Sequence, residues 1–300
     1  MVTFSLFYFS PKPMAEKLLV RALKGGKNTR IVTLNGKKIT KMPSSLERLP
    51  GLRTLDLQNN LISKVCPEIN TLTQLTKLNL GNNLLEEVPK EMKYLTSLRK
   101  LHLFGNGIYR FAPGACDGLQ NLILLNLNNN QLTQIPEEIS RLKSLTYLSL
   151  NHNQLDSIPK ELCFLNNLSE LQLSYNKLVC IPEEIKFLKK LQKLLLVRNN
   201  IEALPEGLCH LMNLRTLDIA GNIIRIFPPG FQFLKLRELY CEENPLFLKQ
   251  PVTAIKQEDV WSLQKWKISR NLHLVPLRIL ICSYKCFNQR GPNLFGIAQV

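Results

Sequence analysis

Four histidines and eight cysteines are the residues of this chain that could hold a metal or act in nucleophilic catalysis. Six of the cysteines are scattered singly, and such isolated cysteines commonly fill core positions as small hydrophobes. The other two, Cys282 and Cys286, form a C-x₃-C pair. Structural zinc sites need four ligands, and Cys282 and Cys286 supply only a half-site, so no metal is predicted.

The sequence contains none of the motifs that usually accompany catalysis. It has no G-x-S-x-G turn, no phosphate-binding Walker loop and no H-E-x-x-H pair. The carboxylate pairs Glu137-Glu138 and Glu183-Glu184 each follow a proline. There the dipole of a short helix favours anions, which is a structural role. We therefore predict a protein that is not an enzyme, with no catalytic residues, no cofactor and no small-molecule substrate.

The excess positive charge of the chain lies at its two ends. The net charge is +16, and residues 1–50 and 249–300 together carry 14 of these charges. A nucleic-acid-binding domain would spread basic residues over its folded part. The ends are interpreted as solvated tails. The alternative is a tether to nucleic acid or an acidic membrane surface, with the membrane surface ranking ahead of nucleic acid among these secondary partners.

The spacing of leucines reveals a repeat. The pattern L-x-x-L-x-L-x-x-N-x-(L/I) returns every 22–24 residues. Numbering each copy from its first leucine, the nine full copies start at Leu52, Leu75, Leu98, Leu122, Leu145, Leu168, Leu191, Leu214 and Leu236. Position nine is asparagine in all of them: Asn60, Asn83, Asn106, Asn130, Asn153, Asn176, Asn199, Asn222 and Asn244. A degenerate tenth copy precedes them, with Lys37 at the asparagine position.

The repeat predicts its own local structure. Leucines at positions four and six alternate as in a short strand with one apolar face. The asparagine falls where the chain must turn, and its amide can both donate to and accept from unpaired backbone groups. Stacked copies would therefore form an asparagine ladder. One copy cannot bury its leucines, whereas stacked neighbours can. An apolar residue and a proline then open a short helical or 3₁₀ segment in most copies.

Four segments follow from this organisation. Residues 1–13 are an apolar, proline-containing extension, and residues 14–28 are an N-terminal capping helix. A helix lying on a membrane surface is the alternative interpretation of that second segment. Residues 29–248 form the solenoid of nine full repeats and one degenerate repeat. Residues 249–300 are a basic C-terminal segment that could cap the last repeat.

These residues resemble the leucine-rich-repeat family over about residues 29–248. The 23-residue unit with its I-P-x-x-(I/L) segment is similar to the intracellular Ras-group subfamily. The resemblance implies an α/β solenoid: a leucine-rich-repeat horseshoe with a parallel β-sheet on the concave face and short helical or 3₁₀ segments on the convex face. It also implies protein binding by the concave face, and a place in small-GTPase, kinase or phosphatase signalling.

Candidate contact residues come from repeat positions three, five, seven and eight, which flank the strand leucines and are expected on the concave face. Apolar and aromatic residues there have no core role, and Tyr and Arg are enriched at interface hot spots. Ordinary exposed apolar surface is the alternative interpretation. The predicted protein-binding set is His102, Phe104, Leu124, Asn126, Asn128, Tyr147, His152, Tyr175, Lys193, Leu195, Val197 and Arg198.

The sequence thus predicts a non-enzymatic interaction module or scaffold with an unidentified protein partner. Val2–Phe9 is apolar but lacks the charge and cleavage site of a secretory signal. Scattered single cysteines fit a reducing compartment. A cytoplasmic location is expected, and a nuclear one stays open.

Overall fold

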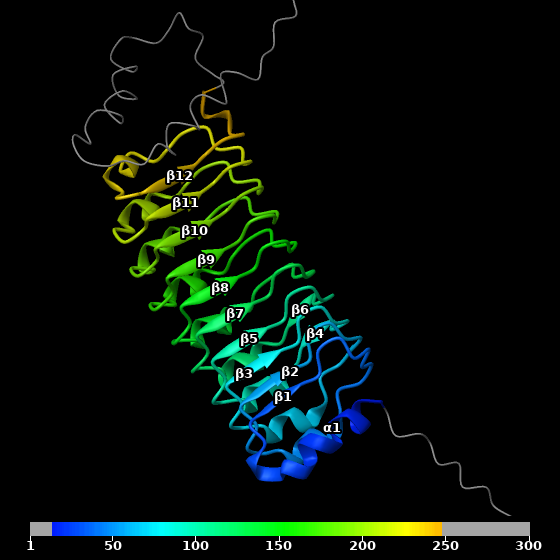
Figure 1. Cartoon of the computed structure of the whole chain (residues 1–300). Helices are drawn as coiled ribbons and strands as arrows, with labels where there is room; N and C mark the ends of the chain where they lie inside the picture. The colour runs from blue at the N-terminus through cyan, green and yellow to red at the C-terminus, as the bar shows by residue number, and fades with distance from the viewer. Residues whose placement is uncertain (1–13, 248–300) are drawn as a thin grey trace, which may run out of the picture. The chain divides into compact units, whose positions relative to one another are not determined.

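A computed structural model describes residues 14–247, which fall into two compact units divided between Leu148 and Ser149. In each unit, every repeat contributes one short strand and, on the opposite side, one short 3₁₀ helix (Figure 1).

The strands of each unit are parallel and stacked in chain order. In the first unit, Leu55 lies opposite Leu78, and Leu78 lies opposite Leu101, so equivalent repeat positions face one another. The main-sheet strands of this unit are β1 (Ile31–Thr33), β2 (Thr54–Asp56), β3 (Lys77–Asn79), β5 (Lys100–His102) and β7 (Leu124–Asn126). Those of the second unit are β9 (Glu170–Gln172), β10 (Lys193–Leu195), β11 (Thr216–Asp218) and β12 (Glu238–Tyr240). The strand β8 (Tyr147–Ser149) contains the division, and β4 (Glu87–Val88) pairs with β6 (Arg110–Phe111) in a separate small sheet.

The helical segments are short because each is only one part of a 22–24-residue repeat. In the first unit they are α1 (Met14–Gly25) and the 3₁₀ helices η1 (Gly26–Asn28), η2 (Ser44–Arg48), η3 (Pro67–Thr71), η4 (Lys90–Tyr94), η5 (Pro113–Asp117) and η6 (Glu137–Arg141). In the second unit they are η7 (Lys160–Phe164), η8 (Glu183–Phe187), η9 (Glu206–His210), η10 (Phe231–Phe233) and η11 (Pro245–Phe247). The predicted parallel strands and short 3₁₀ segments are confirmed.

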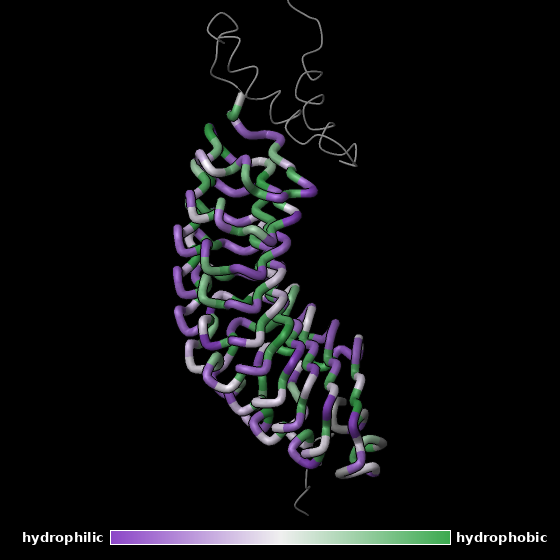
Figure 2. Tube along the Cα trace, turned by 90° about the vertical axis from the view of Figure 1, so that its left-hand side faces the viewer, coloured by the Kyte–Doolittle hydropathy of each residue, from purple (hydrophilic) through white to green (hydrophobic). Residues whose placement is uncertain are grey.

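The core of each unit is built from the repeated leucines. In the repeat that starts at Leu168, Leu171 and Leu173 are fully buried, as are the equivalent leucines of the next repeat. Figure 2 shows hydrophobic and hydrophilic stretches alternating along each repeat. Burying one leucine side chain contributes about 1.5–3 kcal/mol, and only a stacked neighbour completes that burial. At the N-terminal end, Leu19 of α1 is also fully buried.

The asparagine at position nine joins each repeat to the one before it. The Nδ2 of Asn199 donates to the carbonyl oxygens of Leu196 and Leu173, both at 3.0 Å. Its Oδ1 accepts from the backbone N–H of Leu178 at 3.1 Å. Leu173 and Leu178 belong to the preceding repeat, so one amide satisfies backbone groups of two repeats. Asn83 makes the equivalent bonds to Leu57, Leu80 and Ile62 in the first unit.

We predict that Asn199→Ala destabilises the protein by at least about 1–3 kcal/mol, because a buried N–H and buried carbonyl oxygens lose their partner. The matched control is Asn200→Ala, since Asn200 is the exposed neighbour of Asn199. Denaturant unfolding of both variants measures the difference. Equal stability of the two variants would contradict the structural role of the ladder.

Candidate functional site: the strand face

Repeat positions three, five, seven and eight form the exposed side of each sheet, which we call the strand face. The predicted contact residues all lie there and none is fully buried. They fall into two groups. The first unit carries His102, Phe104, Leu124, Asn126, Asn128 and Tyr147, and the second carries His152, Tyr175, Lys193, Leu195, Val197 and Arg198.

In the first unit, Phe104 is placed by a glycine on the neighbouring repeat. A Cβ atom at Gly81 would lie 2.5 Å from Phe104 Cζ, so the ring packs directly on the glycine backbone. His102 meets the same ring edge-on, with 6.4 Å between the ring centroids. Gly81 therefore sets where this aromatic side chain lies on the strand face.

Burial and basic neighbours lower the pKa of His102, the histidine of this group. Partial burial lowers the pKa of His102, and the positive charges of Lys77 and Lys100 lower it further, while Asp56 raises it. These lysines start β3 and β5 and lie side by side in the parallel register. The lowered pKa favours the neutral imidazole, which can serve as a hydrogen-bonding aromatic contact.

In the second unit, the polar side chains of the strand face largely satisfy one another. The oxygen Oε1 of Gln172 accepts from Ser149 Oγ at 2.7 Å and from Asn151 Nδ2 at 2.8 Å. Glu170 forms an ion pair with Lys193 at 3.0 Å. Because these groups are already paired, the polar strand positions have less to offer a partner than the apolar and aromatic positions beside them.

Position eight, directly before the ladder asparagine, has an unusual backbone conformation. It takes a positive φ in every full repeat: Asn59, Asn82, Gly105, Asn129, His152, Tyr175, Arg198, Gly221 and Glu243. Glycine, asparagine and histidine are the residues here that tolerate this left-handed region, whereas tyrosine, arginine and glutamate are strained there. His152, Tyr175 and Arg198 follow one another at this position with φ of 54°, 57° and 54°. We call these three residues the turn row.

The turn row is exposed and internally organised. The rings of His152 and Tyr175 are stacked, with 4.2 Å between centroids and 11° between planes. Tyr175 is 45% exposed. Arg198 lies beside Gly221, whose absent side chain leaves room for it, and pairs with Glu243 at 2.9 Å. The row thus presents aromatic faces and a positioned guanidinium next to the half-buried Leu195 and Val197.

Three cysteines of the described chain lack the low pKa that a nucleophilic thiol needs. Burial, followed by nearby carboxylates, raises the pKa of Cys66, Cys116 and Cys163 to about 12, so their thiols stay protonated. Within residues 14–247, no group of three or more His, Cys, Asp or Glu side chains could hold a metal ion. Cys282 and Cys286 lie outside the described residues.

One carboxylate of the acidic pairs, that of Glu183, is bonded to backbone. Glu183 accepts from the N–H groups of Glu206 and Gly207, at 3.1 and 2.7 Å, at the start of η9. This is a contact between repeats rather than a paired carboxylate site.

Half of the excess charge of the two basic ends falls beyond the described part of the chain. Residues 1–13 and 248–300 are not described, so the tether and the C-terminal cap stay predictions. In the part that is described, no helix combines the length and apolar character that crossing a bilayer requires.

One exposed row was not singled out by the sequence analysis. Phe164, Phe187 and Phe233 end 3₁₀ helices of the second unit and are 36%, 40% and 68% exposed. Phe164 and Phe187 are stacked at 5.4 Å. The signal in the sequence is a phenylalanine at the same repeat position in three repeats.

The fold and the ladder define a repeat protein, and comparison with known proteins gives its class. The family model for the leucine-rich repeat matches residues 50–108, 96–155 and 145–201, and a second such model matches residues 213–234. The chain belongs to the leucine-rich-repeat family, which confirms the resemblance. Proteins of this family commonly mediate protein–protein interactions and are typically not enzymes.

The chain is also similar to individual proteins of this family, in sequence and in structure. The chain is 69% identical to leucine-rich repeat-containing protein 69 of Homo sapiens, over 96% of this chain and 100% of that protein. It is 64% identical to the protein of the same name from Mus musculus, over 95% and 100%. Among solved structures, a Leptospira interrogans leucine-rich-repeat protein has a TM-score of 0.71 at 33% identity, over 83% of this chain and 61% of that one. A plant peptide hormone receptor solved in complex with its RGF2 ligand has a TM-score of 0.65 at 30% identity, over 73% and 36%.

We predict that Lys100→Gln raises the pKa of His102 part of the way back to its ordinary value, because one of two nearby positive charges is removed. NMR titration of the His102 imidazole measures this, with Lys90→Gln on η4 as the control. The lowered pKa in the folded state means that the unfolded chain binds the proton more tightly. Stability attributable to His102 is therefore present above its unfolded pKa and is lost as pH falls toward its folded pKa. A flat response of the pKa to Lys100→Gln would refute the electrostatic cause.

At position eight, Tyr175→Asn should be more stable than Tyr175→Ala by about 1 kcal/mol. Both substitutions remove the ring, but only asparagine tolerates the left-handed backbone. Thermal and denaturant unfolding of the two variants provide the comparison. Equal stabilities would show that Tyr175 carries no backbone strain.

Proposed function

We propose that this protein is an intracellular, non-enzymatic interaction module that binds a protein partner through its strand face. The observation that carries the proposal is the turn row. Tyr175 and Arg198 of this row occupy a backbone conformation that costs large side chains about 1–2 kcal/mol each, where five of the nine full repeats use asparagine or glycine. Strained residues of this kind persist when their side chains serve a function.

The composition of the strand face of the second unit supports a protein partner. Tyr175 offers a large, rigid surface and a hydroxyl, and Leu195 and Val197 offer half-buried apolar side chains. Arg198 is held in place by Glu243, so it can contact a partner while remaining in that ion pair. Tyr and Arg dominate binding energy when neighbouring contacts exclude water from them. The polar network around Gln172 is already satisfied, so it would form a fixed rim rather than the main contact.

An intracellular location is supported by the cysteines. Cys66, Cys116, Cys163, Cys209 and the exposed Cys180 are free thiols. Cysteines of extracellular proteins are usually oxidised to disulfides, whereas those of cytosolic and nuclear proteins are kept reduced. A role in small-GTPase, kinase or phosphatase signalling is the finer part of the proposal, and it rests on the resemblance to Ras-group repeats.

The proposal is tested by quantitative affinity capture with three full-length baits: the unaltered chain, Tyr175→Asn and Tyr94→Asn. Tyr94 ends η4, away from the strand face, and is 46% exposed, so it matches Tyr175 in residue type and exposure. We expect at least one protein to be recovered by the unaltered chain and Tyr94→Asn but lost with Tyr175→Asn. Truncating a hot-spot residue costs about 2 kcal/mol or more, which is roughly a 30-fold loss of affinity.

Circular dichroism of all three baits controls for folding. Binding of the recovered protein is then measured with purified components. Equal affinity for the Tyr175→Asn and Tyr94→Asn variants would reject the strand face as the contact surface.

A further inference from the structure

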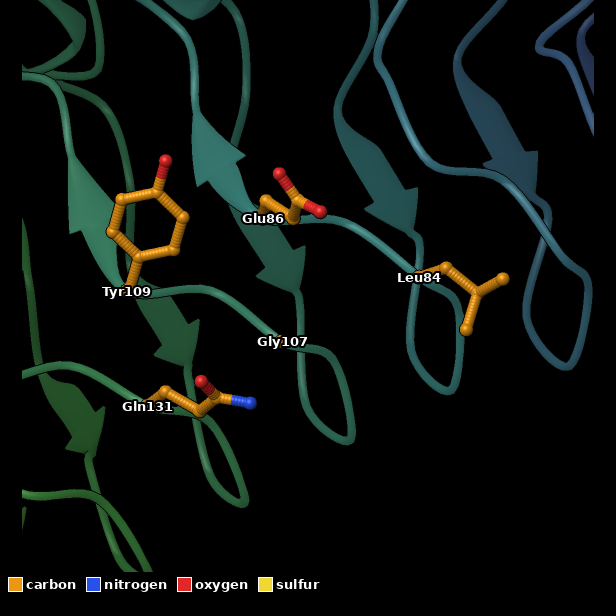
Figure 3. Close-up of a pocket in the computed structure, with 5 residues that line it drawn as sticks. All are labelled: Leu84, Glu86, Gly107, Tyr109 and Gln131. Carbon is orange, nitrogen blue, oxygen red and sulfur yellow. The ribbon is translucent and has the colours of Figure 1, made fainter.

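A second surface of the first unit has the features of a binding site. Leu84, Glu86, Gly107, Tyr109 and Gln131 line a hollow of about 470 Å³ that is open to solvent (Figure 3). It lies beside β4 and β6, away from the strand face, and none of these residues belongs to the contact set discussed above. Its function is therefore independent of the proposed function.

The hollow exists because one repeat lacks a side chain. Leu84, Gly107 and Gln131 occupy the same repeat position, directly after the ladder asparagine, in three consecutive repeats. Two of them project side chains, while Gly107 leaves a gap between them (Figure 3). A Cβ atom at Gly107 would lie 3.6 Å from the carbonyl oxygen of Leu85 and 3.8 Å from Gln131 Nε2, which is ordinary contact. The glycine is therefore not required by packing.

The other two residues place a carboxylate beside an aromatic ring. Glu86 and Tyr109 are also equivalent repeat positions, and the N–H of Tyr109 donates to the carbonyl oxygen of Glu86 at 3.0 Å. Neighbouring strands of this kind are about 4.8 Å apart. Both side chains stand on the same side of the ribbon in Figure 3. Tyr109 is 54% exposed and Leu84 is 55% exposed, so the ring face and the apolar edge are accessible.

Within residues 14–247, Glu86 has no ion-pair partner, because the three ion pairs of that region involve other carboxylates. A lone carboxylate next to an aromatic face attracts a cation from both sides, by charge and by the negative face of the ring. A guanidinium fits this geometry better than an ammonium, because its plane can stack on Tyr109 while its N–H fork bonds the carboxylate of Glu86. The methylene stem would lie along Leu84.

We propose that this hollow binds the side chain of an arginine in a peptide segment of a partner protein. The gap over Gly107 admits the long side chain, Tyr109 and Glu86 select its charge and planarity, and the open side leaves room for the peptide backbone.

The test uses the full chain and a blocked amino acid, N-acetyl-arginine methylamide, titrated by NMR. The signals followed are the backbone amide of Gly107 and the side-chain amide of Gln131. N-acetyl-citrulline methylamide has nearly the same shape without the charge, and N-acetyl-lysine methylamide has the charge without the planar fork. We expect saturable shifts with the arginine compound, at about two- to fivefold lower concentration than with either comparator, as exposed cation–π and ion-pair contacts allow.

Two variants localise the effect. Glu86→Gln should weaken binding of the arginine compound about two- to fivefold. Gly107→Leu should abolish it by filling the gap, whereas Gln154→Leu, at the same repeat position two repeats further on, should leave it unchanged. Unfolding curves confirm that each variant folds. Equal binding of the arginine, lysine and citrulline compounds, or shifts that survive both Glu86→Gln and Gly107→Leu, would overturn the proposal.

Discussion

The structure depends on the hydrogen bonds that the position-nine asparagine makes at the end of every strand. The chain must turn sharply there, and the turn leaves carbonyl oxygens and an N–H group of two repeats without backbone partners. One primary amide has donors and an acceptor in the geometry that satisfies both repeats. Asn199 does this for Leu173 and Leu178 of the preceding repeat. The asparagine bonds fix each strand in register with its neighbour, so the equivalent leucines of successive repeats pack against one another.

The same turn imposes a second constraint with functional consequences. The residue before the asparagine must adopt a left-handed backbone, so asparagine or glycine is the stable choice. Repeats with Asn59, Asn82 and Asn129 follow that rule. The repeats with Tyr175, Arg198 and Glu243 break it and place larger side chains there instead. Local conflict between backbone preference and residue type is expected at sites where function outweighs stability.

The fold was predictable from the sequence because leucine and asparagine recur at fixed spacing, and only one stacked arrangement buries all the leucines at once. Much less of the site was predictable. Position eight varies between repeats, so its left-handed backbone is not visible in the pattern of leucines. The stacking of His152 on Tyr175, and the pairing of Arg198 with Glu243 across Gly221, depend on side-chain directions that spacing does not determine. The hollow at Gly107 arises from a missing side chain, which a search for chemical groups does not detect.

The most direct measurement of the central claim is the intraresidue amide–Hα NOE of His152, Tyr175 and Arg198 in the full chain. A left-handed backbone brings these two protons close together. The account predicts strong NOEs at all three residues, equal to those of Asn59 and Asn129, which share the conformation. Weak NOEs, typical of residues with negative φ, would contradict it, because the turn row would then carry no strain that a binding function has to explain.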